Sequence, residues 1–384
     1  MNGLVSAAAV LTDAIASRVF PAASVEVGSS GGVMWQASFG RLAFDEDAAG
    51  ASPQTVFDLA SLTKVIATTT FVMEQLEAGR LRLDERVAAS FPEWRGVDRE
   101  EATVRDLLEH ASGLPARLVD APPDGRRAFE HEICSLGLEY RRRSRAIYSD
   151  LGFILLGFIV EDTGGAAIDV QFAEMQRDVS ARAAELGRST PNSRSHGPET
   201  WFAPGADLAS RAAPTRLDER SRQPRRAEVD DDNAAALQGV AGHAGLFGTA
   251  PAVGWWAREI LGASRGVPSF DTLASSEVVR RFTRKAATPG SSRALGWDTM
   301  LPTSSCGSRM SARAFGHAGF TGTSLWIDPE ADVYVVLLTN RVHPTADPAS
   351  PIQDVRRAFH DAVMEESQTP VRTTPSKQWD AGSE

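Results

Sequence analysis

The segment Ser61–Lys64 has residue types and a spacing that suit acyl transfer by a serine. It reads Ser-Leu-Thr-Lys and opens an apolar stretch with helical spacing that runs through Phe71 and Leu76. Residues three apart on a helix share one face, so the Lys64 amine is expected within hydrogen-bonding reach of the Ser61 hydroxyl. An amine among apolar residues has a lowered pKa and can take the serine proton. The same letters also occur at an ordinary helix start with a surface lysine.

Several further stretches accompany this quartet in a fixed order. The blocks are Phe57–Lys64, Thr103–Pro115, Tyr148–Asp150, Gly239–Phe247 and Phe315–Thr323. Together they resemble the class C β-lactamases, D-alanyl-D-alanine carboxypeptidases and related esterases, which combine a Ser-x-x-Lys quartet with a tyrosine element and a Lys/His-Thr-Gly element. The resemblance covers about residues 5–362 and is weakest between Arg177 and Asn233.

The resemblance assigns proton handling to Tyr148. In the family this tyrosine is the candidate base for forming and hydrolysing the acyl-enzyme, and neighbouring cations acidify its phenol. Without that context, Tyr148 would be interpreted as a core residue with a satisfied hydroxyl. Asp150 stands where the family more often has asparagine. Because an ionised aspartate only accepts hydrogen bonds, Asp150 is expected to hold the Lys64 ammonium and not to donate to a substrate carbonyl.

The last block is similar to the family element on the strand that edges the site. His317 takes the cationic position, and near its reference pKa of about 6.5 it would be partly charged at pH 7. Gly319 is expected to let substrate backbone approach closely. By analogy, the backbone N–H groups of Ser61 and Phe320 form the oxyanion hole. Ala318 replaces the usual threonine, so one substrate hydroxyl contact is missing.

The glycine-rich block Gly239–Phe247 is similar to a segment of a carboxypeptidase-like subgroup of penicillin-binding proteins. That subgroup has a Val-His-Asp element upstream, whereas this chain reads Val-Asp-Asp at 229–231. The histidine of that element is therefore lost. His243 within the block either lines the cleft or packs in a glycine-rich turn, and the pattern favours neither.

The elements that must position these residues come from both ends of the chain. Helical spacing at Ala7–Val19 is followed by alternating strand patterns at 23–27 and 33–39, joined by a glycine-rich turn. Near the other end, strand patterns at 324–327 and 333–338 are separated by an Asp-Pro-Glu-Ala turn. Strands from both ends are therefore expected to share one sheet.

The middle of the chain is expected to be mainly helical, with helical patterns at 59–78 and 103–110. Together with the resemblance, this predicts an α/β (α+β) fold of the β-lactamase/transpeptidase type, in which an antiparallel sheet flanked by helices lies beside a helical region. The expected divisions are a sheet region at 1–58 and 285–365, a helical region at 59–284 with a polar excursion at about 177–233, and a disordered tail at 366–384.

Composition and charge restrict the class of protein. Of the 384 residues, 42% are apolar, which suffices for a large core, and the formal net charge of -10 argues against nucleic acid or membrane surfaces as partners. Cys134 and Cys306 are expected to be free thiols. The first residues lack the basic segment and apolar core of a signal peptide, and the longest apolar run, 151–160, is shorter than a membrane span. We therefore expect a soluble, cytoplasmic protein.

The predicted activity is hydrolysis of an amide or ester through an acyl-enzyme on Ser61, with Lys64 and Tyr148 as proton carriers and no cofactor. The partner would be a small-molecule or peptide-like acyl substrate. The sequence leaves the oligomeric state open.

Three functions compete. The family favours a β-lactamase or D-alanyl-D-alanine carboxypeptidase-like enzyme, although the expected lack of an export signal argues against cell-wall substrates. A cytoplasmic esterase acting on small acyl esters fits His317, Ala318 and the missing signal. A non-catalytic penicillin-binding sensor or scaffold is left open by Asp150 and Ala318.

Overall fold

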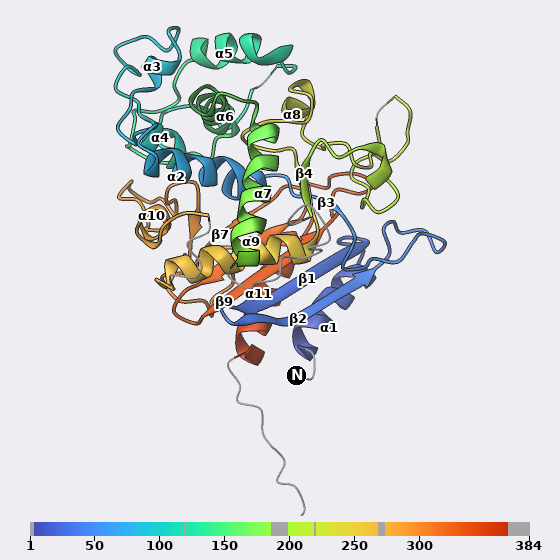
Figure 1. Cartoon of the computed structure of the whole chain (residues 1–384). Coiled ribbons are helices and arrows are strands. Elements are labelled where there is room, and N and C mark those ends of the chain that lie inside the picture. Colours follow the sequence, from blue (N-terminus) through green and yellow to red (C-terminus); the bar gives the residue numbers. More distant parts are fainter. Residues whose placement is uncertain (1–3, 119, 186–198, 219, 268–272, 368–384) are drawn as a thin grey trace, which may run out of the picture.

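A six-stranded antiparallel sheet forms the base of the molecule, with strand order β2-β1-β9-β8-β7-β6 (Figure 1). The computed structural model describes residues 4–118, 120–185, 199–218, 220–267 and 273–367. The strands are β1 (Ala22–Ser29), β2 (Gly32–Gly40), β6 (Asp298–Thr299), β7 (Phe315–Ala318), β8 (Ser324–Asp328) and β9 (Val333–Thr339). The pairing of β1 with β9 confirms that one sheet contains strands from both ends of the chain.

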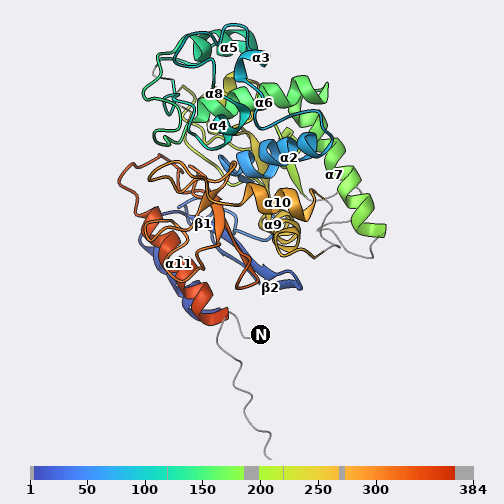
Figure 2. The same cartoon turned by 90° about the vertical axis from the view of Figure 1, so that its left-hand side faces the viewer.

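Successive side chains of the central strands point to opposite faces of the sheet, and both faces carry apolar side chains. In the register of β1 and β9, Val25 lies opposite Leu337 and Val27 opposite Val335. These side chains pack with α1 (Val5–Ala16) and α11 (Ile352–Ser367). The intervening residues of β9 face α9 (Ala250–Ser264) and the larger core. Figure 2 shows α11 and α9 on opposite sides of the sheet, as expected when side chains alternate along each strand.

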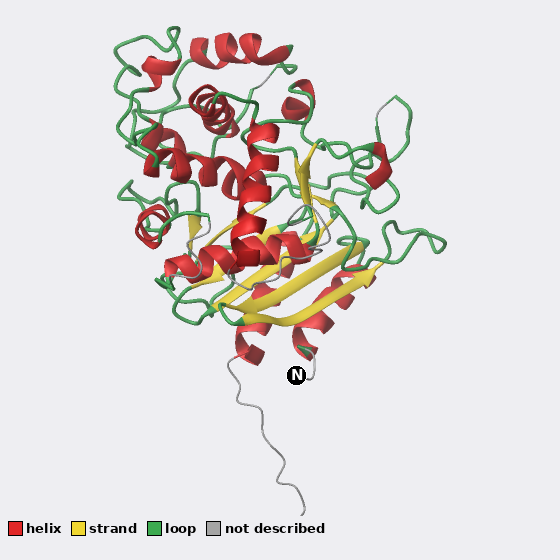
Figure 3. Ribbon diagram, viewed as in Figure 1, coloured by secondary structure: helices red, strands yellow, loops and turns green. Residues whose placement is uncertain are grey.

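Helices form the other half of the molecule, above the sheet in Figure 3. Their bounds are η1 (Lys64–Thr68), α2 (Thr69–Glu77), α3 (Val87–Ser90), α4 (Val104–Leu108), α5 (Gly125–Ser135), α6 (Asp150–Gly164), α7 (Ile168–Glu185), η2 (Ala206–Leu208), α8 (Asp232–Ala236) and α10 (Ser276–Phe282). Because α6 is apolar on every side, it is buried all round from Leu151 to Val160. Within the described ranges, no single helix has the length and hydropathy of a membrane span; only α6 and α7 taken together reach them, with a bend of 66° between the two.

A small three-stranded sheet, with order β3-β5-β4, lies within the helical half and was not predicted. Its strands are β3 (Phe57–Asp58), β4 (Thr200–Phe202) and β5 (Leu246–Gly248). The helix expected from Leu59 begins only at Leu62, because the chain before it pairs with β5.

The predicted divisions of the chain can be compared with the elements only in part. The helix α9, from within the predicted helical region, packs on the large sheet. The helix α7 extends to Glu185 in the predicted excursion, and α11 extends to Ser367 in the predicted tail. The rest of the predicted excursion contains β4, η2 and the start of α8. Residues 186–198 and 219 of the excursion and 368–384 of the tail lie outside the described residues. Cys134 and Cys306 are buried free thiols, as expected.

The buried carboxyl of Glu26 on β1 makes stability depend on pH. Tyr334 Oη donates a hydrogen bond of 2.8 Å to Glu26 Oε1, yet burial outweighs this bond and the charge of Arg258, and raises the pKa of Glu26 from 4.5 to about 7. The unfolded chain therefore loses this proton at lower pH than the folded chain, so the group's contribution to stability falls as the pH rises from about 4.5 to 7.

In Glu26→Gln, the free energy of unfolding is expected to lose the part of its pH dependence between about pH 4.5 and 7 that comes from this carboxyl. In the native protein the group should lower the free energy of unfolding by at most about 3 kcal/mol across that interval. Denaturant unfolding at pH 5, 6, 7 and 8 measures the difference, and exposed Glu74→Gln is the control. Parallel profiles for Glu26→Gln and the native protein would contradict the assignment.

Candidate active site

Ser61 lies at a sharp turn between β3 and the helix that continues through η1 and α2, on the wall of a cleft of about 710 Å³. The preceding residue, Ala60, has a left-handed φ of 48°, and its N–H donates to Asp58 Oδ1 at 2.8 Å. The next hydrogen bonds, from Thr63 N to Ala60 O and from Lys64 N to Ser61 O, are of the i to i+3 type. Side chains three apart are eclipsed in such a turn, so Lys64 lies directly over Ser61.

The Lys64 ammonium is fully buried and has three hydrogen-bond acceptors. It donates to Ser61 Oγ at 3.0 Å, to Asp150 Oδ1 at 2.7 Å and to the His243 carbonyl at 2.9 Å. Burial by itself lowers the pKa of Lys64, but the charges and hydrogen bonds of Asp150 and Tyr148 outweigh it and raise that pKa above its ordinary value. The prediction of a lowered lysine pKa is therefore wrong. Asp150 holds the ammonium in the manner expected.

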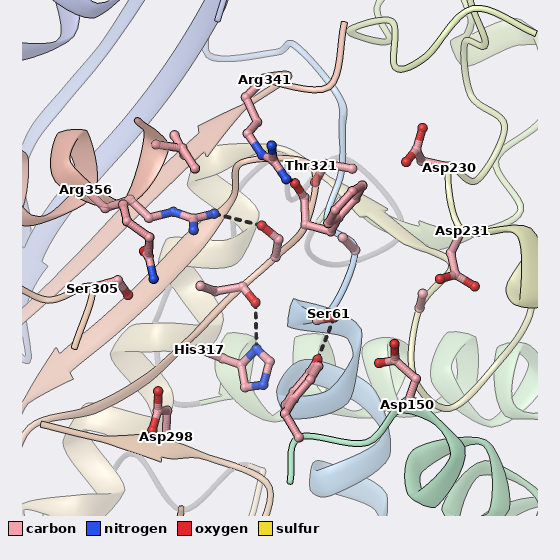
Figure 4. Close-up of a pocket in the computed structure, with 18 of the residues that line it drawn as sticks. Ser61, Asp150, Asp230, Asp231, Asp298, Ser305, His317, Thr321, Arg341 and Arg356 are labelled. Carbon is pink, nitrogen blue, oxygen red and sulfur yellow. Dashed lines mark hydrogen bonds between the residues drawn. The ribbon is translucent and has the colours of Figure 1, made fainter. Parts of the chain in front are cut away.

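Tyr148 lies on the other side of the nucleophile, where its Oη donates to Ser61 Oγ at 2.8 Å. Figure 4 shows this bond, with Ser61 between His317 on one side and Asp150 on the other. Burial raises the pKa of Tyr148, and the nearby Lys64 charge lowers it by less. The phenol is thus protonated in the resting site, and the expectation of an acidified phenol is wrong.

His110 supports Tyr148 from behind. The two ring centroids are 4.7 Å apart, and the backbone N–H of Ser149 donates to His110 Nδ1 at 3.0 Å. Burial, followed by the positive charges of Arg293 and Lys64, lowers the pKa of His110 well below its usual range. His110 therefore acts as a neutral acceptor that fixes the backbone beside Tyr148. His110 lies in the block Thr103–Pro115 that contributes to the family resemblance, but no role for this residue was predicted.

His317 is buried at the opposite wall of the cleft, with Nδ1 hydrogen-bonded to the Ala318 carbonyl at 3.0 Å. Burial and then the charge of Arg293 lower the pKa of His317 well below 6.5. His317 is consequently neutral at pH 7, and the predicted partial charge is wrong. Arg293 supplies positive charge to this wall instead, a role that no local pattern in the sequence indicated.

Gly319 is needed for close packing against the turn at residues 59–61, called here the nucleophile turn, and not for opening space for substrate. A Cβ built on Gly319 would collide with the Thr323 hydroxyl, lie 2.8 Å from the Leu59 carbonyl oxygen and 3.2 Å from Ala60 Cβ. Its missing side chain therefore points into the protein, and the expected reason for this glycine is wrong. Glycine is needed because the end of β7 and the nucleophile turn approach each other so closely.

Phe320 lines the cleft beside Ser61, with its side chain 56% exposed. Within the described part of the chain, the backbone N–H groups of Ser61 and Phe320 donate to no other protein group. Both donors remain available to a ligand, as an oxyanion hole requires.

The glycine-rich block Gly239–Phe247 holds the base of the site through its backbone. Its carbonyls accept hydrogen bonds from Lys64 and from Thr68 Oγ1, the latter at 2.6 Å from Gly242 O. The His243 side chain is buried with Nε2 2.8 Å from Asp231 Oδ1. Of the two alternatives for His243, the structure therefore favours packing in the turn, while the neighbouring Asp231 lines the cleft.

A serine hydroxyl that contacts a buried lysine and a tyrosine, beside two free backbone donors, defines the site of a serine hydrolase of the acyl-enzyme type. The chain matches the family model described as "Beta-lactamase" over residues 7–358, and it belongs to the β-lactamase family.

Curated relatives and solved structures are consistent with this membership. The chain is 29% identical over 356 residues, 86% of its own length and 79% of the relative's, to an N-acetylmuramyl-L-alanine amidase of Bacillus subtilis (strain 168). It is 30% identical over 329 residues, 78% of its length and 72% of the relative's, to a putative D-alanyl-D-alanine carboxypeptidase of Escherichia coli (strain K12). A penicillin-binding protein homologue from Caulobacter crescentus shares the fold, with a TM-score of 0.70 at 18% identity over 94% of this chain and 98% of that one.

Proposed function

We propose that the protein hydrolyses an amide or ester bond in a peptide-like acyl substrate that carries a carboxylate near the scissile carbonyl, as a D-alanyl-D-alanine carboxypeptidase does. Family membership supplies the acyl-enzyme chemistry. The position of Arg293 carries the choice of substrate. The name of the Escherichia coli relative supports the same choice.

Arg293 presents a guanidinium to the cleft that has few partners of its own. Its side chain is 20% exposed, and its guanidinium carbon lies 5.0 Å from the centre of the Tyr148 ring. Among the described residues its one ion-pair partner is Asp298, at 3.9 Å. A guanidinium has five N–H donors in a fork that matches a carboxylate. With His317 neutral, Arg293 places a positive charge beside Tyr148 that is suited to bind an anionic end of the substrate.

The proposed reaction begins when Ser61 Oγ attacks the carbonyl carbon and the backbone N–H groups of Ser61 and Phe320 stabilise the oxyanion. The Ser61 proton passes through Lys64 and Tyr148 to the leaving amine or alcohol as the C–N or C–O bond breaks. Water then adds to the acyl-enzyme, giving up its proton by the same route, and Ser61 is released with the carboxylic acid product.

The resting site holds the protons of both Lys64 and Tyr148, since both pKa values are raised. Only a form of this pair with one proton fewer can accept the serine proton. The proportion of that form grows with pH, so kcat/KM is expected to rise through the neutral range.

A second candidate function is hydrolysis of small neutral esters. The neutral His317 and the methyl side chain of Ala318 leave this edge of the cleft without the cation and hydroxyl of the family element, which supports an esterase. A cytoplasmic location stays a prediction.

Arg293→Gln is expected to separate these two functions. For a peptide ending in a free carboxylate, kcat/KM should fall roughly 10- to 100-fold, mainly through KM, because a charge-assisted hydrogen bond contributes about 1.5–3 kcal/mol. The C-terminal amide of the same peptide should be affected much less. Steady-state kinetics on the matched pair measure the difference, and equal losses on both peptides would contradict carboxylate binding by Arg293.

Intact-mass spectrometry tests the acyl-enzyme function itself. The native protein would be mixed with a β-lactam, a D-alanine-terminated peptide and an activated ester, and its mass followed over time. We expect a transient adduct on the peptide carrying Ser61, with release of product. A stable stoichiometric adduct without product would identify a non-catalytic sensor, and no adduct with any of the three would refute the proposal.

A further inference from the structure

The two halves of the oxyanion hole come from segments far apart in the sequence, and buried threonines join them. Thr321 Oγ1 donates to the Asp58 carbonyl at 2.8 Å, and Thr323 Oγ1 donates to the Leu59 carbonyl at 3.0 Å. Both threonines are buried, at 1% and 0% exposure. Thr321 directly follows Phe320, and Thr323 ends the turn formed by residues 319–323. The acceptors Asp58 and Leu59 lie three and two residues before Ser61. Each bond therefore links the backbone beside one oxyanion donor to the backbone beside the other.

Arg356, on α11, holds the same turn from behind. Its Nη2 donates to the Gly319 carbonyl at 2.7 Å and to the Thr323 carbonyl at 2.8 Å, so one guanidinium nitrogen bridges the two ends of the turn. The side chain is 5% exposed and has no ion-pair partner among the described residues. Figure 4 shows Arg356 reaching across to this segment, on the side of the cleft away from Asp150.

We propose that Thr321, Thr323 and Arg356 are positioning residues that fix the separation between the N–H groups of Ser61 and Phe320. This inference rests on the proposed function only in requiring that Ser61 is acylated. An oxyanion donor is effective at 2.7–3.1 Å from the charged oxygen, and removal of one donor costs about 10²–10³ in kcat. When a hydrogen bond between the turn before Ser61 and the turn after Phe320 is removed, one N–H donor is no longer held at this distance from the oxyanion. The oxyanion forms only in the transition state, so the rate constant kcat falls and KM does not change.

Thr323→Val is the most direct test, because valine keeps the shape of the side chain and removes the hydroxyl. We expect kcat to fall roughly 10- to 100-fold with KM changed less than about threefold. The rate of covalent modification by a fluorophosphonate, whose tetrahedral oxygen occupies the same hole, should fall in parallel. Thr323→Ser restores the donor and should recover most of the rate.

Thr339→Val is the matched control, because the Thr339 hydroxyl is buried nearby on β9 and has no hydrogen-bond partner in the described structure. It should leave both rates within about twofold of the native values. Thr321→Val and Arg356→Lys should lower kcat in the same sense as Thr323→Val, each measured well below its own melting temperature.

Two results would overturn the inference. The first is a Thr323→Val protein that reacts with fluorophosphonate at the native rate. The second is a loss of kcat that Thr323→Ser does not recover or that Thr339→Val reproduces. If Ser61 of the native protein is not acylated at all, the proposed function is refuted instead. Measuring the native protein alongside the variants distinguishes this outcome from the other two.

Discussion

Ser61→Ala is expected to lower hydrolysis of a chromogenic ester by roughly 10⁴- to 10⁶-fold, the largest effect of any single substitution in this protein. Alanine removes the oxygen that Lys64 and Tyr148 both contact, at 3.0 and 2.8 Å. The side chain is small and the turn is held by its backbone, so the variant should remain folded. Steady-state rates and intact-mass measurements after fluorophosphonate treatment check the expectation.

Ser292→Ala is the matched control for this experiment, because Ser292 also lines the cleft. It should retain most of the native rate and still form the fluorophosphonate adduct. Turnover that persists in Ser61→Ala, or an adduct that maps to another residue in that variant, would remove Ser61 from the mechanism.

Tyr148→Phe is expected to lower kcat/KM by roughly 10²- to 10⁴-fold, the range of a lost general acid–base group. The substitution removes the hydroxyl that donates to Ser61 Oγ and leaves the packing of the ring on His110 in place. In the native enzyme kcat/KM should rise with pH as the Lys64–Tyr148 pair loses a proton. That rise should be reduced in the variant. Rate profiles between pH 6 and 9 measure both effects.

Tyr334→Phe provides the same chemical change away from the cleft. The Tyr334 hydroxyl donates to Glu26 within the sheet, so its loss should change stability and leave the rate at 25 °C near the native value. Equal rates for Tyr148→Phe and Tyr334→Phe would show that the Tyr148 phenol carries no proton in the reaction.

The large sheet and the contacts of Ser61 could be predicted because their signals are local or belong to recognisable blocks. Strand patterns at β1 and β9 are visible in the sequence, and they predicted that strands from both ends of the chain share one sheet. The contact between Ser61 and Lys64 could be predicted from their spacing alone, because side chains three residues apart in a tight turn lie next to each other.

The charge states of the site could not be predicted, since they depend on residues distant in the sequence. Burial lowers the pKa of Lys64, and Asp150, 86 residues away, together with Tyr148 reverses the direction of the shift. The pKa of His317 is lowered by complete burial and by the charge of Arg293. The reason for Gly319 likewise lies in Leu59 and Thr323. Arg293 and Arg356 carry no local signal that distinguishes them from the other arginines of this chain.

The pairing of β1 with β9 has a consequence for how the protein is synthesised. Ala23 lies opposite Thr339, so the β1–β2 hairpin leaves the ribosome long before its partner strand β9 has been synthesised. Phe320 and the threonines after it are likewise made long after Ser61. A chain that ends before Phe320 lacks one of the two proposed oxyanion donors, so we expect hydrolytic activity only after the last strands of the large sheet have been synthesised.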